Sequence, residues 1–197
     1  MSIEFAQSET KQNLMRAFAG ESQARNRYTF AASLAQQQNL YVIQSIFTFT
    51  AGQEQAHAKV FYDLLTPAAG ENIRVDGNYP VNIGPDLLTH LRAAQHNEYQ
   101  EHEVDYSNFS KIAHEEGFEE ISKIFEMIAD VEKTHGDRFG RFADLLEQEK
   151  LFVADAQVQW MCLHCGQVMN ATRAPALCPI CKHPQGYFIR LELVPFQ

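Results

Sequence analysis

Long stretches of the chain carry apolar and small residues at three- and four-residue steps, the spacing of helices that bury one face. Asn39 marks a tight break, Asp86 is placed to cap a helix start, and Gly117 is placed to end one. The expected helices cover residues 9–37, 41–65, 86–116 and 118–148. The Gly- and Pro-rich stretch 67–85 is long enough to connect opposite ends of a bundle. The pattern predicts a four-helix bundle with one long crossover.

The second half of this helical region looks like a copy of the first. A shift of 78 positions aligns aromatic, small and metal-ligand residue types. The aligned pairs are Tyr28/Tyr106, Phe47/Phe125, Ala51/Ala129, Glu54/Glu132, His57/His135 and Phe61/Phe139. Agreement of several residue types at one offset predicts two related helix pairs packed around a shared site.

Two of the expected helices carry a Glu-x-x-His pair, Glu54 with His57 and Glu132 with His135. Residues at i and i+3 project from the same face of a helix, so each pair offers a metal one oxygen and one nitrogen atom. A single pair of this kind is usually a solvated surface feature. Two pairs at matched positions predict a core site for two divalent cations.

Such a site also needs carboxylates from the other two helices. On the first helix Glu21 lies on the apolar stripe, whereas Glu9 is close to the helix start. On the third helix Glu98 and Glu101 share a face, whereas Glu103 points elsewhere. The predicted metal ligands and catalytic residues are Glu21, Glu54, His57, Glu98, Glu101, Glu132 and His135. This set has one carboxylate more than the usual two-metal site, which allows an exchangeable coordination position.

Tyrosines and unmatched histidines are further candidates for this site. Tyr28 and Tyr106 are either plain core aromatics or hydroxyl donors to ligand carboxylates. Histidines without a matched partner are usually surface or packing residues, and no function is assigned to them. They are His90, His96, His102, His114, His164 and His183.

The four cysteines all lie in the last quarter of the chain as two Cys-x-x-Cys pairs, Cys162 with Cys165 and Cys178 with Cys181. This grouping predicts two knuckles that present four thiolates to one metal, rather than a disulfide framework. Zinc in this site would be structural, whereas iron would carry one electron at a time. Spacing alone favours zinc.

Composition sets the outer limits of the interpretation. With 197 residues, 45% of them hydrophobic, the chain has room for one main core and a small satellite, and we place the domains at 1–150 and 158–197. The net charge of −9, from 25 acidic and 16 basic residues, argues against nucleic acid or an anionic membrane as partner. The first residues lack a signal-peptide pattern, and no apolar run reaches the roughly 20 residues of a membrane span. We expect a cytoplasmic protein.

Taken together, the motifs resemble the rubrerythrin family over essentially the whole chain. The matching segments are 20–28, the two Glu-x-x-His helices, Glu98-x-x-Glu101, 115–118 and the region from Trp160 to Cys181. The resemblance implies a mainly α fold: a ferritin-like bundle with a non-haem di-iron centre, and a small C-terminal rubredoxin-like domain of strands and knuckles with one iron on four cysteines. It further implies reduction of hydrogen peroxide to water in an oxygen-sensitive microbe, by a homodimer arranged head to tail.

The resemblance also implies a role for each residue of the bundle site. Glu54 and Glu132 would bridge the two irons. Glu21 would hold the first iron together with His57 or Glu101. In the family the first iron exchanges a carboxylate for a histidine on reduction, which here means leaving Glu101 for His57.

The second iron would be held by Glu98 and His135. The third helix departs from the family pattern at two positions. Asn97 stands where a glycine often precedes the first ligand, and His102 stands where an aromatic residue often follows the second. If these departures shift the ligand set, Glu103 replaces Glu101 as the candidate.

Three functions compete at this level. The first is a peroxidase supplied with electrons by a separate NADH-linked reductase or by rubredoxin, because no Gly-x-Gly-x-x-Gly dinucleotide motif occurs in the chain. The second is ferritin-type oxidation of ferrous iron, against which the built-in cysteine module argues. The third is a zinc-ribbon interaction protein, which iron in the cysteine site would exclude.

Overall fold

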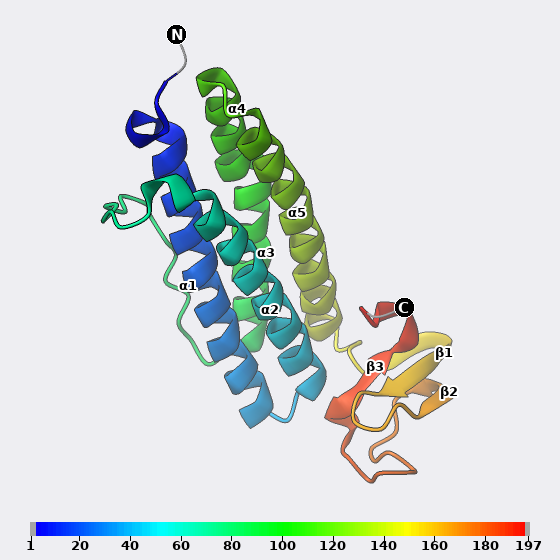
Figure 1. Cartoon of the computed structure of the whole chain (residues 1–197). Coiled ribbons are helices and arrows are strands. Elements are labelled where there is room, and N and C mark those ends of the chain that lie inside the picture. The colour runs from blue at the N-terminus through cyan, green and yellow to red at the C-terminus, as the bar shows by residue number, and fades with distance from the viewer. Residues whose placement is uncertain (1–2, 196–197) are drawn as a thin grey trace.

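The computed structural model describes residues 3–195 as a helical bundle with a small sheet at one end (Figure 1). The helices are α1 (Glu9–Gln37), α2 (Tyr41–Leu64), α3 (Leu87–Gln100), α4 (Tyr106–Glu116) and α5 (Glu119–Glu147). A π-helical turn, Glu101–Asp105, joins α3 to α4, so that the two form one continuous rod. The predicted four-helix bundle is confirmed, with the third helix divided by the π turn. Within the described residues, no helix is long and apolar enough to cross a membrane.

The helix ends follow the capping residues of the sequence. Asp86 accepts hydrogen bonds from two N–H groups in the first turn of α3. Gly117 ends α4 in the left-handed conformation, with φ of 89°. The Glu116 carboxylate accepts hydrogen bonds from the N–H groups of Glu9 and Thr10, at 2.9 and 2.8 Å. This carboxylate therefore ties the start of α1 to the end of α4 and satisfies donors that a helix start leaves unpaired.

The connection between α2 and α3 is the predicted long crossover. After a short 3₁₀ turn (Thr66–Ala68), the chain runs along α1 without regular structure until α3 begins. Side chains of α1 and of the residue that follows it bond to the crossover at three levels, at Gln12 with Arg74, Arg27 with Asn82 and Gln38 with Pro85. The crossover is thus held against the bundle over most of the length of α1.

The bundle core has two apolar layers, related by the sequence repeat. In one layer, the ring of Tyr28 lies 5.9 Å from that of Phe47 and 5.0 Å from that of Phe139. In the other layer, the ring of Tyr106 lies 5.9 Å from that of Phe125 and 5.5 Å from that of Phe61. The Phe47/Phe139 and Phe61/Phe125 rings are each 5.1 Å apart. The two halves of the repeat are therefore related in space by a pseudo-two-fold axis. The polar middle of the bundle lies between their equivalent aromatic layers.

The C-terminal region forms an antiparallel sheet in the order β2-β1-β3, with β1 at Val153–Cys162, β2 at Val168–Arg173 and β3 at Phe188–Arg190. Its small core includes Trp160 and Phe188, which are fully buried. β1 begins at Val153, where its backbone pairs with Arg173.

This small domain packs directly on the end of the bundle (Figure 1). The rings of Tyr41, at the start of α2, and Tyr187 stack with centroids 3.9 Å apart. Ile189 on β3 is buried in the apolar cluster of the bundle. A Cβ atom at Gly186 would lie 1.9 Å from the carbonyl oxygen of Asn39, so only glycine permits this approach.

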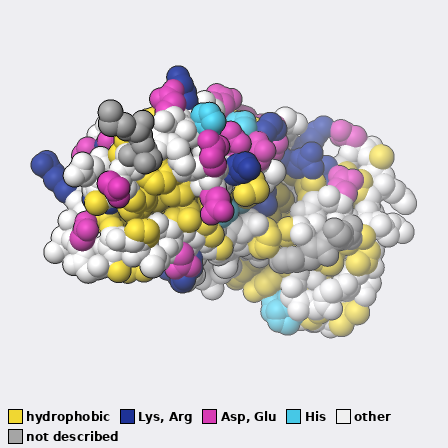
Figure 2. Space-filling model, turned by 45° about the horizontal axis from the view of Figure 1, so that its top comes forward, with side chains coloured by type: hydrophobic (Ala, Val, Ile, Leu, Met, Phe, Trp, Pro, Cys, Tyr) yellow, Lys and Arg dark blue, Asp and Glu magenta, His cyan; other side chains and the backbone are white. Residues whose placement is uncertain are grey.

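On the face seen in Figure 2, acidic side chains are distributed among basic ones over the bundle. Hydrophobic side chains show between them, on the bundle and on the small domain. Acidic and basic side chains are thus interspersed on this face.

We predict that Gly186→Ala loosens the small domain from the bundle, because the added methyl group meets backbone rather than a flexible side chain. Overpacking of this kind costs roughly 1–3 kcal/mol. Thermal unfolding followed by circular dichroism should show a lower midpoint. The matched control is Gly84→Ala, where an added Cβ has open space. Equal midpoints for the two variants would contradict the prediction.

Candidate metal centres

Four carboxylates and two histidines meet in the middle of the bundle, between the aromatic layers. Their nitrogen and oxygen atoms form two overlapping groups, each within 4.8 Å. The first group is Glu21, Glu54, His57 and Glu132, and the second is Glu54, Glu98, Glu132 and His135. Each of the four rods of the bundle contributes at least one of these side chains. Because Glu54 and Glu132 belong to both groups, they lie where a carboxylate can bridge two cations.

The distances repeat across the pseudo-two-fold. The Nδ1 atom of His57 lies 2.9 Å from an oxygen of Glu132 and 3.4 Å from one of Glu54. The Nδ1 atom of His135 lies 2.8 Å from the other oxygen of Glu132 and 3.0 Å from the other oxygen of Glu54. Glu21 and Glu98, which each belong to only one group, repeat this pattern. An oxygen of Glu21 lies 3.8 Å from the Nδ1 atom of His57, and an oxygen of Glu98 lies 3.4 Å from the Nδ1 atom of His135.

These side chains fit a pair of cations better than they fit one another. Both oxygens of Glu54 and of Glu132, one oxygen each of Glu21 and Glu98, and the Nδ1 atoms of both histidines are buried without a hydrogen-bond partner. Unpaired buried carboxylates cost several kcal/mol each, and mixed oxygen and nitrogen atoms this close together suit divalent transition metals. The six residues therefore supply what a two-metal centre requires.

The charges in this cluster shift the pKa values of its members strongly. Burial, reinforced by the charge of Glu54, raises the pKa of Glu98 to about 8. At Glu54 burial acts in the same direction, but the two histidines outweigh it and lower the pKa to about 2. Burial acts to lower the pKa of His135, and the adjoining Glu132 and Glu54 carboxylates raise it to about 12. Without metal, the cluster thus retains protons that cations must displace.

Two tyrosines complete the polar layer. The hydroxyl of Tyr28 donates a hydrogen bond to Glu98, and that of Tyr106 donates one to Glu21. All four side chains are buried, and each bond crosses between two helices. Of the two interpretations left open by the sequence, the structure supports the hydroxyl donor, although the same rings also pack in the core.

The π turn explains a gap in the sequence repeat. Tyr28 follows Glu21 by seven residues, whereas Tyr106 follows Glu98 by eight. The extra residue lies in the π turn, so residues before it repeat at an offset of 77. The pairs at this offset include Leu14/Leu91, Ala17/Ala94 and Glu21/Glu98. A single offset of 78 missed this relation, although a search that allows one insertion could have found it.

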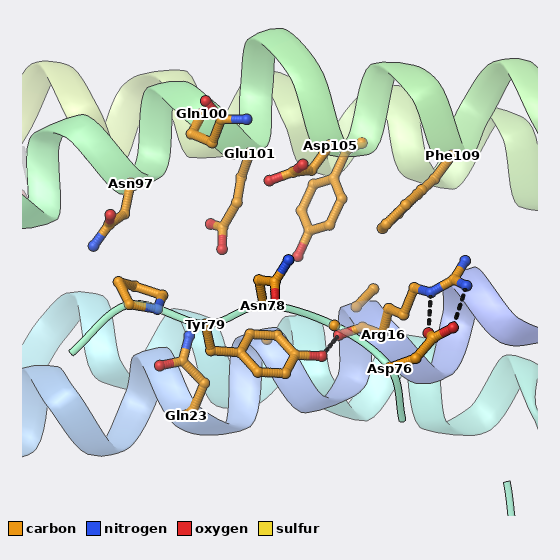
Figure 3. Close-up of a pocket in the computed structure, with 15 residues that line it drawn as sticks. Arg16, Gln23, Asp76, Asn78, Tyr79, Asn97, Gln100, Glu101, Asp105 and Phe109 are labelled. Atoms are coloured by element: carbon orange, nitrogen blue, oxygen red, sulfur yellow. Dashed lines mark hydrogen bonds and ion pairs between the residues drawn. The ribbon is translucent and has the colours of Figure 1, made fainter. Parts of the chain in front are cut away.

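Glu101, the seventh predicted ligand, lies outside both close groups. It begins the π turn and points into a pocket of about 300 Å³ between α1, the π turn and the crossover (Figure 3). Burial and the charge of Glu98 hold the pKa of Glu101 well above its usual value. The alternative candidates lie elsewhere, since Glu103 is exposed and Glu9 pairs with Arg16 at the surface.

The four cysteines form the second candidate site. The Sγ atoms of Cys162 and Cys181 are 3.7 Å apart, and those of Cys165 and Cys178 are 3.6 Å apart. A tetrahedral metal with bonds of about 2.3 Å has sulfur atoms about 3.8 Å apart, so this spacing fits one ion. At Cys178 burial acts to raise the pKa, but the N–H groups of Cys181 and Ile180 lower it to about 6. The geometry is that of two knuckles facing one metal.

The unassigned histidines are dispersed. The rings of His164 and His183 stack 3.6 Å apart beside the cysteine knuckles. His90 and His102 contact backbone carbonyls of Gly84 and Ala129, both at 2.8 Å. Sequence reasoning also missed Gln53, whose side-chain oxygen lies 3.1 Å from the Nε2 atom of His135.

A four-helix bundle with a carboxylate and histidine pair site, joined to a four-cysteine knuckle domain, defines the class of two-site iron proteins with a ferritin-like and a rubredoxin-like part. The model of the family described as rubrerythrin matches residues 12–143, and that of the rubrerythrin rubredoxin-like domain matches residues 160–189. The chain belongs to the rubrerythrin family. Its members are oxidoreductases, and the chain has their di-iron centre and their rubredoxin-type iron at the four cysteines, rather than the zinc that spacing alone favoured.

Individual relatives agree with this assignment. The chain is 42% identical to the rubrerythrin of Clostridium perfringens, over 92% of this chain and 93% of that protein. It is 39% identical to the rubrerythrin of Nitratidesulfovibrio vulgaris, over 92% and 93% of the two chains. A solved structure of nigerythrin in a partially reduced state matches with a TM-score of 0.64 and 25% identity, covering 96% of this chain and 88% of that one.

Removal of the metal should make stability depend on pH. Between pH 6.5 and 8 the folded metal-free chain retains protons on His135 and Glu98 that the unfolded chain has released. The free energy of unfolding of the metal-free protein should therefore fall as pH rises through this range, by roughly 1–3 kcal/mol per pH unit. Urea unfolding at several pH values measures this slope. The iron-loaded protein is the control, and an equal slope in both forms would contradict the prediction.

Proposed function

We propose that this protein is a non-haem di-iron peroxidase that reduces hydrogen peroxide to water as part of protection against oxidative stress. The observation that carries the proposal is the presence, in one chain, of a buried pair site and a four-cysteine site packed on the same bundle. The reaction consumes one peroxide, two electrons and two protons and yields two water molecules. A pair of ferrous ions held by the carboxylates and histidines would supply the two electrons, and an iron held by the four cysteines would allow their return one at a time.

The proposed ligand roles follow the geometry of the two groups. Glu54 and Glu132 would bridge the two irons, since each faces both histidines through different oxygens. Glu21 and His57 would hold the first iron, whereas Glu98 and His135 would hold the second. The hydroxyls of Tyr28 and Tyr106 hold the two terminal carboxylates in place through hydrogen bonds. At the cysteine site the ligands are Cys162, Cys165, Cys178 and Cys181.

Glu101 is the exchangeable ligand of the first iron in this proposal, alternating with His57. Its position supports the assignment, because it starts the π turn and lies close enough to Glu98 and Glu21 for their charges to raise its pKa. Its counterpart in the first half of the repeat is Ala24, so only one iron has an additional carboxylate.

Peroxide would reach the site through the pocket into which Glu101 points (Figure 3). The crossover forms one wall of this pocket. Tyr79 donates a hydrogen bond to the backbone carbonyl of Arg16, at 2.9 Å, and the Arg16 guanidinium pairs with Asp76, at 2.7 Å. The polar groups that line this pocket suit a polar substrate, and its volume leaves ample room for hydrogen peroxide.

The remaining assignments concern partners and location. We propose a cytoplasmic homodimer arranged head to tail, in which the cysteine domain of one subunit reduces the bundle site of the other. Exposed apolar side chains support such contacts, with Leu177 and Ile180 on the cysteine knuckles 57% and 65% exposed and Phe30 on α1 67% exposed. Electrons would come from an NADH-linked reductase or from rubredoxin.

The test is the visible spectrum of the fully reduced protein, held without oxygen, before and after one equivalent of hydrogen peroxide. Rapid return of the iron–thiolate absorption is expected, because electrons must leave the cysteine site for the peroxide-reactive centre. Cys178→Ser should abolish this absorption. A protein that stays reduced in the presence of peroxide would contradict the proposal and favour ferritin-type iron oxidation.

Glu101→Ala should lower the peroxidase rate by about tenfold or more, because an exchangeable carboxylate is lost. It should also abolish the redox-linked ligand change, which Mössbauer spectra of the oxidised and reduced protein would report. Glu103→Ala is the matched control, since Glu103 lies two residues away on the same π turn and is exposed. If only the control altered the rate and the spectra, the exchangeable role would pass to Glu103.

A further inference from the structure

The two histidines of the bundle site differ in what holds their outer nitrogen atoms. The Nε2 atom of His135 lies 3.1 Å from the side-chain oxygen of Gln53. For His57, no hydrogen bond to Nε2 occurs within residues 3–195, and its side chain is 12% exposed, whereas that of His135 is fully buried. A hydrogen bond at Nε2 therefore holds the ring of His135, whereas the ring of His57 has no such contact among the described residues.

Arg138 decides the orientation of the Gln53 amide. Its Nη1 atom donates a hydrogen bond to the Gln53 oxygen, at 3.0 Å, and another to Thr50 Oγ1, at 2.9 Å. Since a guanidinium only donates, Gln53 must present its oxygen and not its NH₂ group at this point. The guanidinium also lies over the ring of Phe49, 5.0 Å from its centroid.

The fixed oxygen in turn selects the tautomer of His135. An acceptor facing Nε2 requires that this nitrogen carry the proton, which leaves a lone pair on Nδ1. Nδ1 is the atom that faces Glu132, Glu54 and Glu98. The hydrogen-bond chain from Thr50 to His135 thus holds the imidazole in the tautomer whose Nδ1 atom can bind a metal among these carboxylates.

The sequence repeat provides an internal comparison for this chain of contacts. At the 78-residue offset, Gln53 corresponds to Val131, Arg138 to Val60 and Thr50 to Ile128. Each polar member has an apolar counterpart in the half of the site that contains His57. The asymmetry is therefore a property of the residues themselves and not of the overall packing.

We infer that Gln53, oriented by Arg138, is a positioning residue that fixes His135, so that the second metal position is held rigidly while His57 is left free to move. The inference rests on the proposed ligand set. On this inference, ligand exchange is possible at the first metal position for two reasons. Within residues 3–195, no hydrogen bond holds the Nε2 atom of His57, and Glu101 supplies an extra carboxylate.

The test is proton NMR of the reduced, iron-loaded protein, in which the imidazole N–H of a bound histidine is shifted by the paramagnetic iron and exchanges with D₂O. Wild type should show one slowly exchanging N–H, from His135. Gln53→Leu should make this exchange rapid and weaken iron binding at that position by about 10–100-fold. Gln55→Leu, on the exposed face of the same helix, is the matched control and should leave both unchanged.

Gln53→Glu distinguishes positioning from a purely structural role. A carboxylate accepts the same two hydrogen bonds, so slow exchange and iron affinity should return, while the stronger acceptor should lower the midpoint potential of the di-iron centre. Thr50→Val, a smaller change, should leave folding intact and speed the exchange by loosening Arg138.

The results distinguish failure of the proposed ligand set from failure of the positioning role of Gln53. If no shifted imidazole N–H is found in wild type, the proposed ligand set fails and this inference fails with it. If the slow N–H is present in wild type and remains slow in Gln53→Leu, the ligand set stands and the positioning role of Gln53 is overturned.

Discussion

The bundle is organised by the need to compensate negative charge in its core. Glu21, Glu54, Glu98 and Glu132 have at most 1% of their surface exposed, and two histidines and two tyrosine hydroxyls cannot satisfy all of their oxygens. An apolar core of the same volume would be easier to fold. Cations held by these carboxylates compensate that charge, so metal binding and the stability of the bundle are linked. The aromatic layers on either side exclude water from this region and strengthen every charge interaction within it.

The site is nearly two-fold symmetric, and its departures from symmetry are chemically meaningful. Duplicated aromatics, bridging glutamates, histidines and tyrosine hydroxyls make the two metal positions equivalent to a first approximation. Glu101 and its pocket belong to only one half, whereas the contacts of Gln53 and Arg138 belong to only the other. In the proposed ligand set, one end of the site is thereby adjustable, and the other end is fixed.

Much of this could be read from the sequence, because it depends on local patterns. Helical periodicity, Asp86 and Gly117 defined the rods, and the repeated Glu-x-x-His pairs marked the residues that meet in the core. The π turn could not be read in this way, since no residue type specifies it and only the mismatch between two repeat offsets reveals it. The contact between Gln53 and His135 spans 82 positions and has no motif. The approach of Gly186 to Asn39 likewise depends on how two domains meet.

The π turn also bears on how such a site can arise. Two copies of a helix pair, once joined in one chain, begin with identical halves and therefore with identical metal positions. A single codon inserted between Glu98 and Tyr106 is accommodated by widening one turn of the helix, without displacing the aromatic layers on either side. Point substitutions could then recruit the residues of the widened turn in one half alone. One extra residue in a repeated helix pair can thus make two related metal positions unlike, while the aromatic layers keep their places.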